Sequence, residues 1–194
     1  MKKIAFIIIF FVISCSSNKA SSPQELVENV IDNDIVKMSG FMKYIPEDEH
    51  PVVAFSYDFI AAFLIQFSSN EDIKKRYKDI RAKFKLPDTI NISDEIDLKN
   101  PLTMIQFAQK NYNINCVAYV AEIEDFLNFA DPQHAVSYDN VKIEELVYVK
   151  ISGDTATGVV KYENGKTEEV TFVKINGVWY FSIKYSLLKR YIIK

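Results

Sequence analysis

Residues 152–180 read SGDTATGVVKYENGKTEEVTFVKINGVWY, and this stretch decides the fold class. Glycines at positions 153, 165 and 177 mark turns, and β-branched and aromatic residues fill the intervals between them. Asn before Gly between such runs is typical of β-hairpins, because both central residues of a type I′ turn adopt positive φ. The pattern predicts four antiparallel strands, near residues 141–151, 154–162, 167–175 and 178–185.

Upstream of these strands the apolar residues recur at helical spacing. Ser22, Pro23 and Glu25 form the pattern of a helix start with a capping box, and this helix is expected to run to about Ser39-Gly40. A helix from Val52 to Phe67 is apolar on nearly every side, and such helices are buried. Three more helices are predicted over 71–85, 101–110 and 116–130, with an irregular connection over 86–99.

Helices followed by an antiparallel meander make an α+β fold. The N-terminal helices are expected to pack on the C-terminal four-stranded antiparallel meander. Neither an internal repeat nor a linker interrupts the sequence from the first helix to the last strand. Residues 22–194 are therefore predicted to form a single α+β domain.

The N-terminus has the pattern of a secretory signal. Lys2 and Lys3 precede an unbroken apolar run from Ile4 to Ile13, as a charged n-region precedes an h-region. The run is about ten residues long, whereas a membrane-spanning helix needs about 20, so a retained transmembrane helix is not expected. Residues 1–14 are predicted to be a cleaved signal peptide.

The end of this run, Val12-Ile13-Ser14-Cys15, resembles the lipobox of bacterial prolipoproteins. The resemblance implies that Cys15 is lipidated and becomes the first residue after cleavage, with acyl chains such as palmitate holding it in the membrane. Residues 15–21 are then the lipidated cysteine and a short tether. Ser16 stands where inner-membrane lipoproteins of Gram-negative bacteria tend to have Asp, which points to the outer membrane of the cell envelope. The alternative is an ordinary cleaved signal in which a cysteine happens to follow Ser14.

Charge and cysteine content exclude other classes of function. With Lys2 and Lys3 removed, 21 of the 23 basic side chains remain against 26 acidic ones, a formal net charge of −5. Nucleic-acid binding is disfavoured, because phosphate contacts need a basic face. Cys116 is the only cysteine besides Cys15, so no intramolecular disulfide is expected. Its apolar neighbours predict a buried small hydrophobe.

Both ends of the chain resemble small bacterial lipoproteins of the nuclear transport factor 2-like superfamily. The resemblance implies a curved antiparallel sheet that wraps against helices to form a cone, with a pocket at the wide end. The helices between about 52 and 130 make the middle of this chain longer than that of the usual domain. The residues that carry the resemblance are Ser22-Pro23-Gln24-Glu25-Leu26-Val27, Gly153 to Val160, Glu169 to Lys174, and Gly177-Val178-Trp179-Tyr180.

Few residues point to a reaction. A catalytic triad needs a histidine between nucleophile and acid, but His50 and His134 lie near prolines in polar surroundings and are interpreted as loop residues. Neither has the ligand spacing of a zinc site. The run Glu47-Asp48-Glu49-His50 lacks the alternating ligands and the turn glycine of a calcium loop. No glycine-rich phosphate loop is present, so no metal or cofactor is predicted.

Two hypotheses about function follow. The first is a non-enzymatic, lipid-anchored envelope protein that binds a small apolar ligand or an envelope protein partner, with some of its 14 Phe and 11 Tyr lining a cavity. The second is a pocket enzyme of the dehydratase or isomerase kind that uses Asp58 as acid or base, because burial raises the pKa of a carboxyl group. The structural alternative for Asp58 is an exposed position or a bond to a neighbouring hydroxyl. The basic and apolar tail, residues 184–194, either enters the lipid headgroups or docks on its own domain.

Overall fold

The computed structural model describes residues 19–35, 37–90, 96–97, 100–131 and 142–192. The predicted signal peptide, Cys15 and His134 lie outside these ranges, and the expectations about them stay predictions. In the described part, helices come first, four strands follow, and one more helix comes after the last strand. The predicted α+β class is confirmed.

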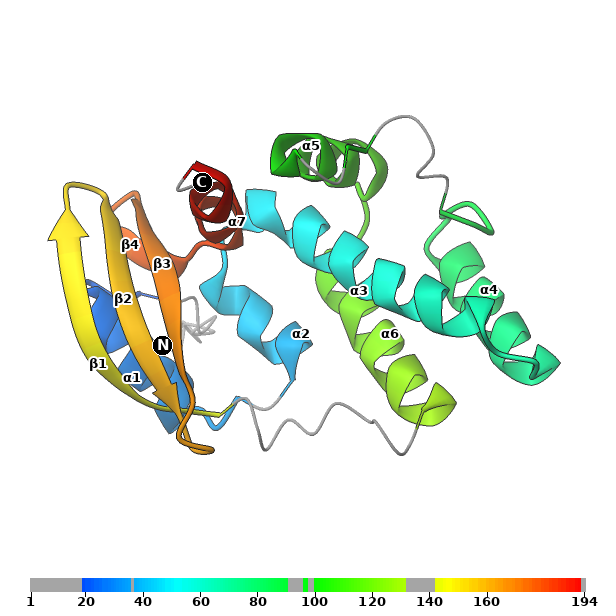
Figure 1. The fold of residues 1–194 in the computed structure, drawn as a ribbon, viewed down its shortest axis with the longest axis horizontal. Helices are drawn as coiled ribbons and strands as arrows, with labels where there is room; N and C mark the ends of the chain where they lie inside the picture. The colour runs from blue at the N-terminus through cyan, green and yellow to red at the C-terminus, as the bar shows by residue number, and fades with distance from the viewer. Residues whose placement is uncertain (1–18, 36, 91–95, 98–99, 132–141, 193–194) are drawn as a thin grey trace, which may run out of the picture.

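The four strands form one antiparallel sheet in the order β1-β2-β3-β4 (Figure 1). Asn176 and Gly177 have φ values of 51° and 86°, as the predicted type I′ turn between β3 and β4 requires. At Asn164-Gly165 only the glycine has a positive φ, so the β2–β3 turn is of another kind. The strands are β1 Ile143–Ser152, β2 Thr155–Tyr162, β3 Thr167–Ile175 and β4 Val178–Phe181.

Helix α1 (Pro23–Asp32) packs on one face of this sheet. The Ser22 hydroxyl oxygen accepts a hydrogen bond of 3.1 Å from the backbone N–H of Glu25, as a helix cap does. The prediction that this helix reaches Ser39-Gly40 is wrong. Asp34 has a φ of 46°, which breaks the helical path, and the chain starts a separate short helix, α2 (Met38–Phe41).

The sheet and α1 enclose the first of two hydrophobic cores. Alternate residues of β2 face α1, as the period of a strand requires. Ala20 is also fully buried in this core, and its carbonyl accepts a 2.9 Å hydrogen bond from the Trp179 N–H. The fold therefore includes residues that the sequence assigned to the tether. The core consists of Ala20, Leu26, Val27, Val30, Tyr44, Ala156, Val160, Phe172, Trp179 and Phe181.

The second core lies in a helical bundle beside the sheet (Figure 1). The predicted caps are confirmed: Asn70 and Asn100 each accept hydrogen bonds from backbone N–H groups of the helix that follows. Cys116 is buried, as predicted. The bundle helices are α3 (His50–Gln66), α4 (Glu71–Lys83), α5 (Pro101–Asn111) and α6 (Cys116–Ala130), preceded by single 3-10 turns at Met42–Tyr44 and Glu47–Glu49.

The C-terminal half of α3 departs from its prediction. The helix was expected to be buried all round, but only its first half is enclosed. Phe63 and Phe67 are 58% and 73% exposed, and their ring centroids lie 4.9 Å apart.

No helix within the described ranges has both the length and the apolarity needed to cross a bilayer.

Helix α7 (Ile183–Ile192) lies, with α2, between the sheet and the bundle (Figure 1). Strand β4 ends at Phe181 instead of the predicted 185, because the chain turns there into α7. Leu187 and Leu188 pack against the bundle core, while Phe41 of α2 packs against both cores. The start of the tail thus docks on its own domain, as a helix.

Candidate functional site

The short β4 strand leaves a groove at one end of the sheet. Its four residues pair only with Phe172–Ile175, and the Ser182 N–H makes one more bond, of 2.8 Å, to the Thr171 carbonyl. The chain then leaves the sheet as α7, so the first residues of β3 have no β4 partner. The groove opens at this place and encloses about 310 Å³.

The walls of the groove come from the sheet on one side and from α2 and α7 on the other. Its apolar lining suits a small ligand, because pockets are typically apolar with a few polar groups that fix orientation. The sequence did not single out these residues, since they come from α2, from three strands of the sheet and from α7. The apolar lining consists of Met38, Phe41, Ile143, Val170, Phe181, Ile183 and Leu187.

A tyrosine and a glutamate form the main polar feature of the lining. The Tyr162 hydroxyl donates a 2.8 Å hydrogen bond to the Glu168 carboxylate. Burial, together with the nearby Glu168 charge, raises the pKa of Tyr162 well above its ordinary value. Tyr162 is therefore a neutral donor at pH 7. Thr171, Ser182 and Ser186 add polar groups near the start of α7.

A buried glutamate holds the start of α7. Glu49 is 3% exposed, and its carboxylate accepts hydrogen bonds from the Ser182 hydroxyl (2.7 Å) and from the N–H groups of Ile183 (2.7 Å) and Lys184 (2.9 Å). Burial raises the pKa of Glu49 and outweighs these hydrogen bonds, which act in the opposite direction. From the sequence this acidic run was considered only as a calcium loop, whereas in the structure Glu49 caps the start of a helix.

A second buried glutamate holds the start of α2 in the same way. Glu124 of α6 is fully buried and accepts hydrogen bonds from the Met38 N–H (2.7 Å), the Ser39 N–H (3.2 Å) and the Ser39 hydroxyl (2.7 Å). One signal in the sequence could have revealed it, since Glu124 stands on the apolar stripe of its helix. Both helices that wall the groove therefore begin at a carboxylate supplied by another element.

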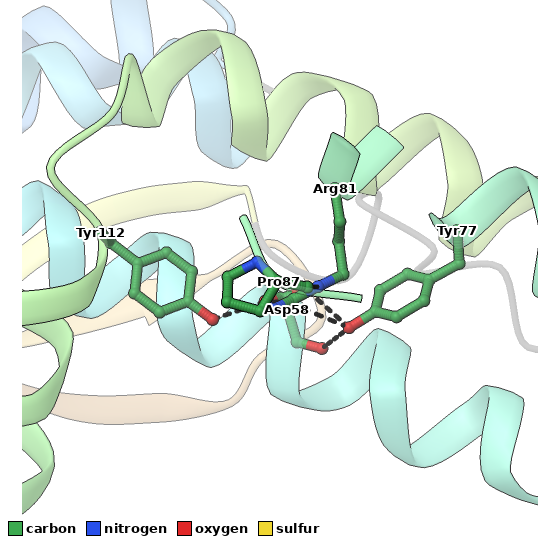
Figure 2. Close-up of polar contacts among 5 residues, drawn as sticks. All are labelled: Asp58, Tyr77, Arg81, Pro87 and Tyr112. Atoms are coloured by element: carbon green, nitrogen blue, oxygen red, sulfur yellow. Dashed lines mark hydrogen bonds and ion pairs between the residues drawn. The ribbon is translucent and has the colours of Figure 1, made fainter. Parts of the chain in front are cut away.

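Asp58 lies elsewhere, inside the bundle, and is fully buried (Figure 2). Tyr77 and Tyr112 reach its carboxylate from opposite sides, with hydrogen bonds of 2.7 and 2.5 Å. Arg81 forms an ion pair with it and donates from Nε to the Pro87 carbonyl at 2.5 Å. The cluster joins α3, α4 and the end of α5, so the bond to a neighbouring hydroxyl, weighed from the sequence, is present.

The electrostatics of this cluster suit a structural tie. Burial and the Asp58 charge raise the pKa of both Tyr77 and Tyr112, so both stay protonated as donors. Burial alone would lower the pKa of Arg81, but Asp58 more than reverses this effect and the net shift is upward. The Tyr119 hydroxyl nearby is buried without a hydrogen-bond partner among the described residues. Both carboxylate oxygens of Asp58 already have partners, which leaves little capacity to exchange a proton with a substrate.

A second hollow, of about 370 Å³, lies on the other side of Tyr77. Phe59, Phe63 and Ile90 form much of its wall, and Asp58 is not part of it. A substrate in this hollow would meet the Tyr77 side chain rather than the carboxylate. His50 is the one histidine within the described ranges. It is not the loop residue interpreted from the sequence, because it is the first residue of α3, and its Nε2 lies 2.8 Å from the Met42 carbonyl oxygen.

Within the described ranges, no three His, Cys, Asp or Glu side chains are grouped so that they could hold a metal ion. Comparison with known proteins gave no family model, no curated protein and no solved structure that matches this chain.

Proposed function

We propose that this protein is a non-enzymatic, lipid-anchored protein of the bacterial cell envelope that binds a small ligand in the groove between the sheet, α2 and α7. The observation that carries the proposal is the groove itself, an apolar recess of about 310 Å³ with the hydrogen-bonded pair of Tyr162 and Glu168 in its wall. A recess of that volume lies at the lower end of the range for small-molecule sites. The resemblance to nuclear transport factor 2-like lipoproteins leads to the same expectation.

The dehydratase or isomerase alternative receives less support. It requires Asp58 to exchange a proton with a substrate, yet this carboxylate is fully buried and bound to Arg81, Tyr77 and Tyr112. A catalytic base must come within hydrogen-bond reach of the proton that it removes. Asp58 lines neither the groove nor the hollow beside Tyr77.

Binding is tested by titrating 4-butylbenzyl alcohol, a neutral probe with an apolar body, into the full chain held in phosphatidylcholine nanodiscs. Calorimetry, with empty nanodiscs subtracted, should give saturable heat for one site. Ser186→Phe fills the groove from α7 and should weaken binding at least about tenfold, which corresponds to about 1.4 kcal/mol. Ser152→Phe makes the same change at the exposed end of β1, outside the groove, and should leave binding unchanged. No saturable heat, or equal binding to both variants, would refute the proposal.

Lipid attachment is tested separately. Metabolic labelling with a fatty acid should mark the wild-type chain and not Cys15→Ala. Because Ala20 is already part of the fold, residues 16–19 alone would separate the lipid from the domain. At about 3.3–3.6 Å per residue, their reach is about 14 Å, so the groove would stay close to the membrane surface. Labelling that persists in Cys15→Ala would refute the anchor.

A further inference from the structure

The second half of α3, with the residue that caps its end, carries an exposed apolar stripe, called here the α3 stripe. At about 100° of turn per residue, its four side chains fall within a sector of about 100° and so point in one direction. Each side chain is between 38% and 73% exposed. Together they leave about 400 Å² of apolar surface in water, and exposed patches of that size are often functional. The α3 stripe consists of Phe59, Ile60, Phe63 and Phe67.

This half of α3 lies at the end of the molecule away from the sheet, together with the start of α4 and the end of α6 (Figure 1). Lys75 and Arg76 of α4 are exposed, and the Arg76 guanidinium carbon lies 4.4 Å from the ring centroid of Phe129, which is 46% exposed. Glu71 and Asp72 are also exposed on α4 and offset part of the positive charge. Exposed aromatic residues beside Lys and Arg are typical of surfaces that rest in the headgroup region of a bilayer.

The predicted anchor would hold the domain against a bilayer. If Cys15 carries the lipid, residues 16–19 reach about 14 Å, whereas a domain of this length is about 40 Å across. Because the reach is shorter than the width of the domain, one face of the domain must rest on the head groups. The Ala20 carbonyl is bonded to Trp179 of β4, so the anchor enters beside the sheet, and the α3 stripe lies in the bundle. Contact at both places would lay the long axis of the molecule along the membrane (Figure 1).

We propose that the α3 stripe is a second membrane contact, whose phenylalanine rings enter the boundary between the head groups and the acyl chains of a phospholipid bilayer. The inference rests on the lipid anchor of the proposed function and adds the face of the domain that meets the membrane. The rings are stabilised there by leaving water, while Lys75 and Arg76 keep their charged ends among the phosphate groups. Two copies of the chain that covered each other's stripes would instead shield these rings from lipid.

Quenching of tryptophan emission by brominated lipid tests this contact. The full lipidated chain is placed in phosphatidylcholine vesicles whose acyl chains either carry bromine close to the head groups or carry none. Phe67→Trp puts a fluorophore on the α3 stripe, and the emission of the wild type is subtracted because Trp179 is 3% exposed in the sheet core. Brominated lipid should reduce the remaining emission at least about twofold, because an interfacial surface sinks about 5–10 Å into the bilayer. Phe63→Trp, one helical turn earlier, should give the same result.

The matched control is Ile151→Trp. Ile151 is 53% exposed on β1, at the edge of the sheet opposite β4 and Ala20, so brominated lipid should leave the emission of this variant unchanged. Flotation of the vesicles separates the two proposals: a wild-type chain that does not float with them would show that the lipid anchor of the proposed function fails. A chain that floats, but whose two phenylalanine variants are unquenched or are quenched no more than Ile151→Trp, would overturn the inference alone.

Discussion

The substitution Glu49→Ala should release the start of α7 from the rest of the fold. Glu49 accepts from two backbone N–H groups and from the Ser182 hydroxyl, at 2.7 to 2.9 Å, in a site that is 3% exposed. A buried donor left without an acceptor costs about 1–3 kcal/mol. Two N–H groups left without an acceptor therefore predict a loss of about 2–6 kcal/mol in the free energy of unfolding, and water entering the vacated space favours the lower end. Glu49→Gln, which retains one accepting oxygen, should lose less.

The assay combines urea unfolding with hydrogen exchange resolved to single amides. Glu47→Ala is the control, because Glu47 lies exposed on the same 3-10 turn and should change stability by less than about 0.5 kcal/mol. Relative to the wild type, Glu49→Ala should accelerate exchange at the amides of residues 183–188 more than at those of β2. A loss below about 1 kcal/mol, or equal acceleration across the whole sheet, would show that the three hydrogen bonds do not hold α7 in place.

Three further predictions concern pH, the buried cluster and the sheet. Burial raises the pKa of Glu49 in the folded state, so the folded chain binds the proton more tightly than the unfolded chain. The stability that this difference contributes is fully present below about pH 4.3 and is lost as pH rises through the raised pKa. In a pH series of urea unfolding, Glu49→Gln should remove this pH-dependent component. Arg81→Met strands the Asp58 charge and should cost about 3–5 kcal/mol in urea unfolding, whereas adding Asp58→Asn should recover part of that loss; no recovery would contradict the ion-pair account. Gly158→Ala would place a Cβ 2.9 Å from the Tyr148 carbonyl oxygen, so it should lower stability by about 1–3 kcal/mol in thermal unfolding, and an unchanged melting temperature would count against this packing.

Local signals predicted much of the fold. Asn70 and Asn100 correctly predicted the starts of α4 and α5, and Asn176-Gly177 correctly predicted the last hairpin. These signals are local, because a side-chain cap or a positive φ acts over a few residues. The two errors in length, at the end of α1 and the end of β4, arose where a local conformation or a tertiary contact overrode propensity. Asp34 ends α1 because it adopts a positive φ. Glu49 ends β4 because its carboxylate accepts from the Ile183 N–H and so caps a helix directly after Phe181.

A ligand pocket was expected from the resemblance to a family and from the many aromatic residues, but the residues of the groove could not be named from the sequence. Met38, Val170 and Leu187 come from segments far apart in the chain, and no periodic pattern connects them. For Asp58 the sequence left three possibilities open, namely burial, an exposed position and a bond to a neighbouring hydroxyl, and the structure shows it buried and bonded to two tyrosine hydroxyls. Its partners Arg81 and Tyr112 lie 23 and 54 residues away, so the sequence could not show that they bind the carboxylate.

The central claim is that the groove between the sheet, α2 and α7 holds a small ligand against its apolar lining. A crystal structure of the full chain with 4-butylbenzyl alcohol tests it most directly. The account predicts the butylphenyl group between Phe41 and Leu187 in the groove. Density for the compound in the hollow beside Phe63 instead, with the groove filled by water or by protein side chains, would contradict it.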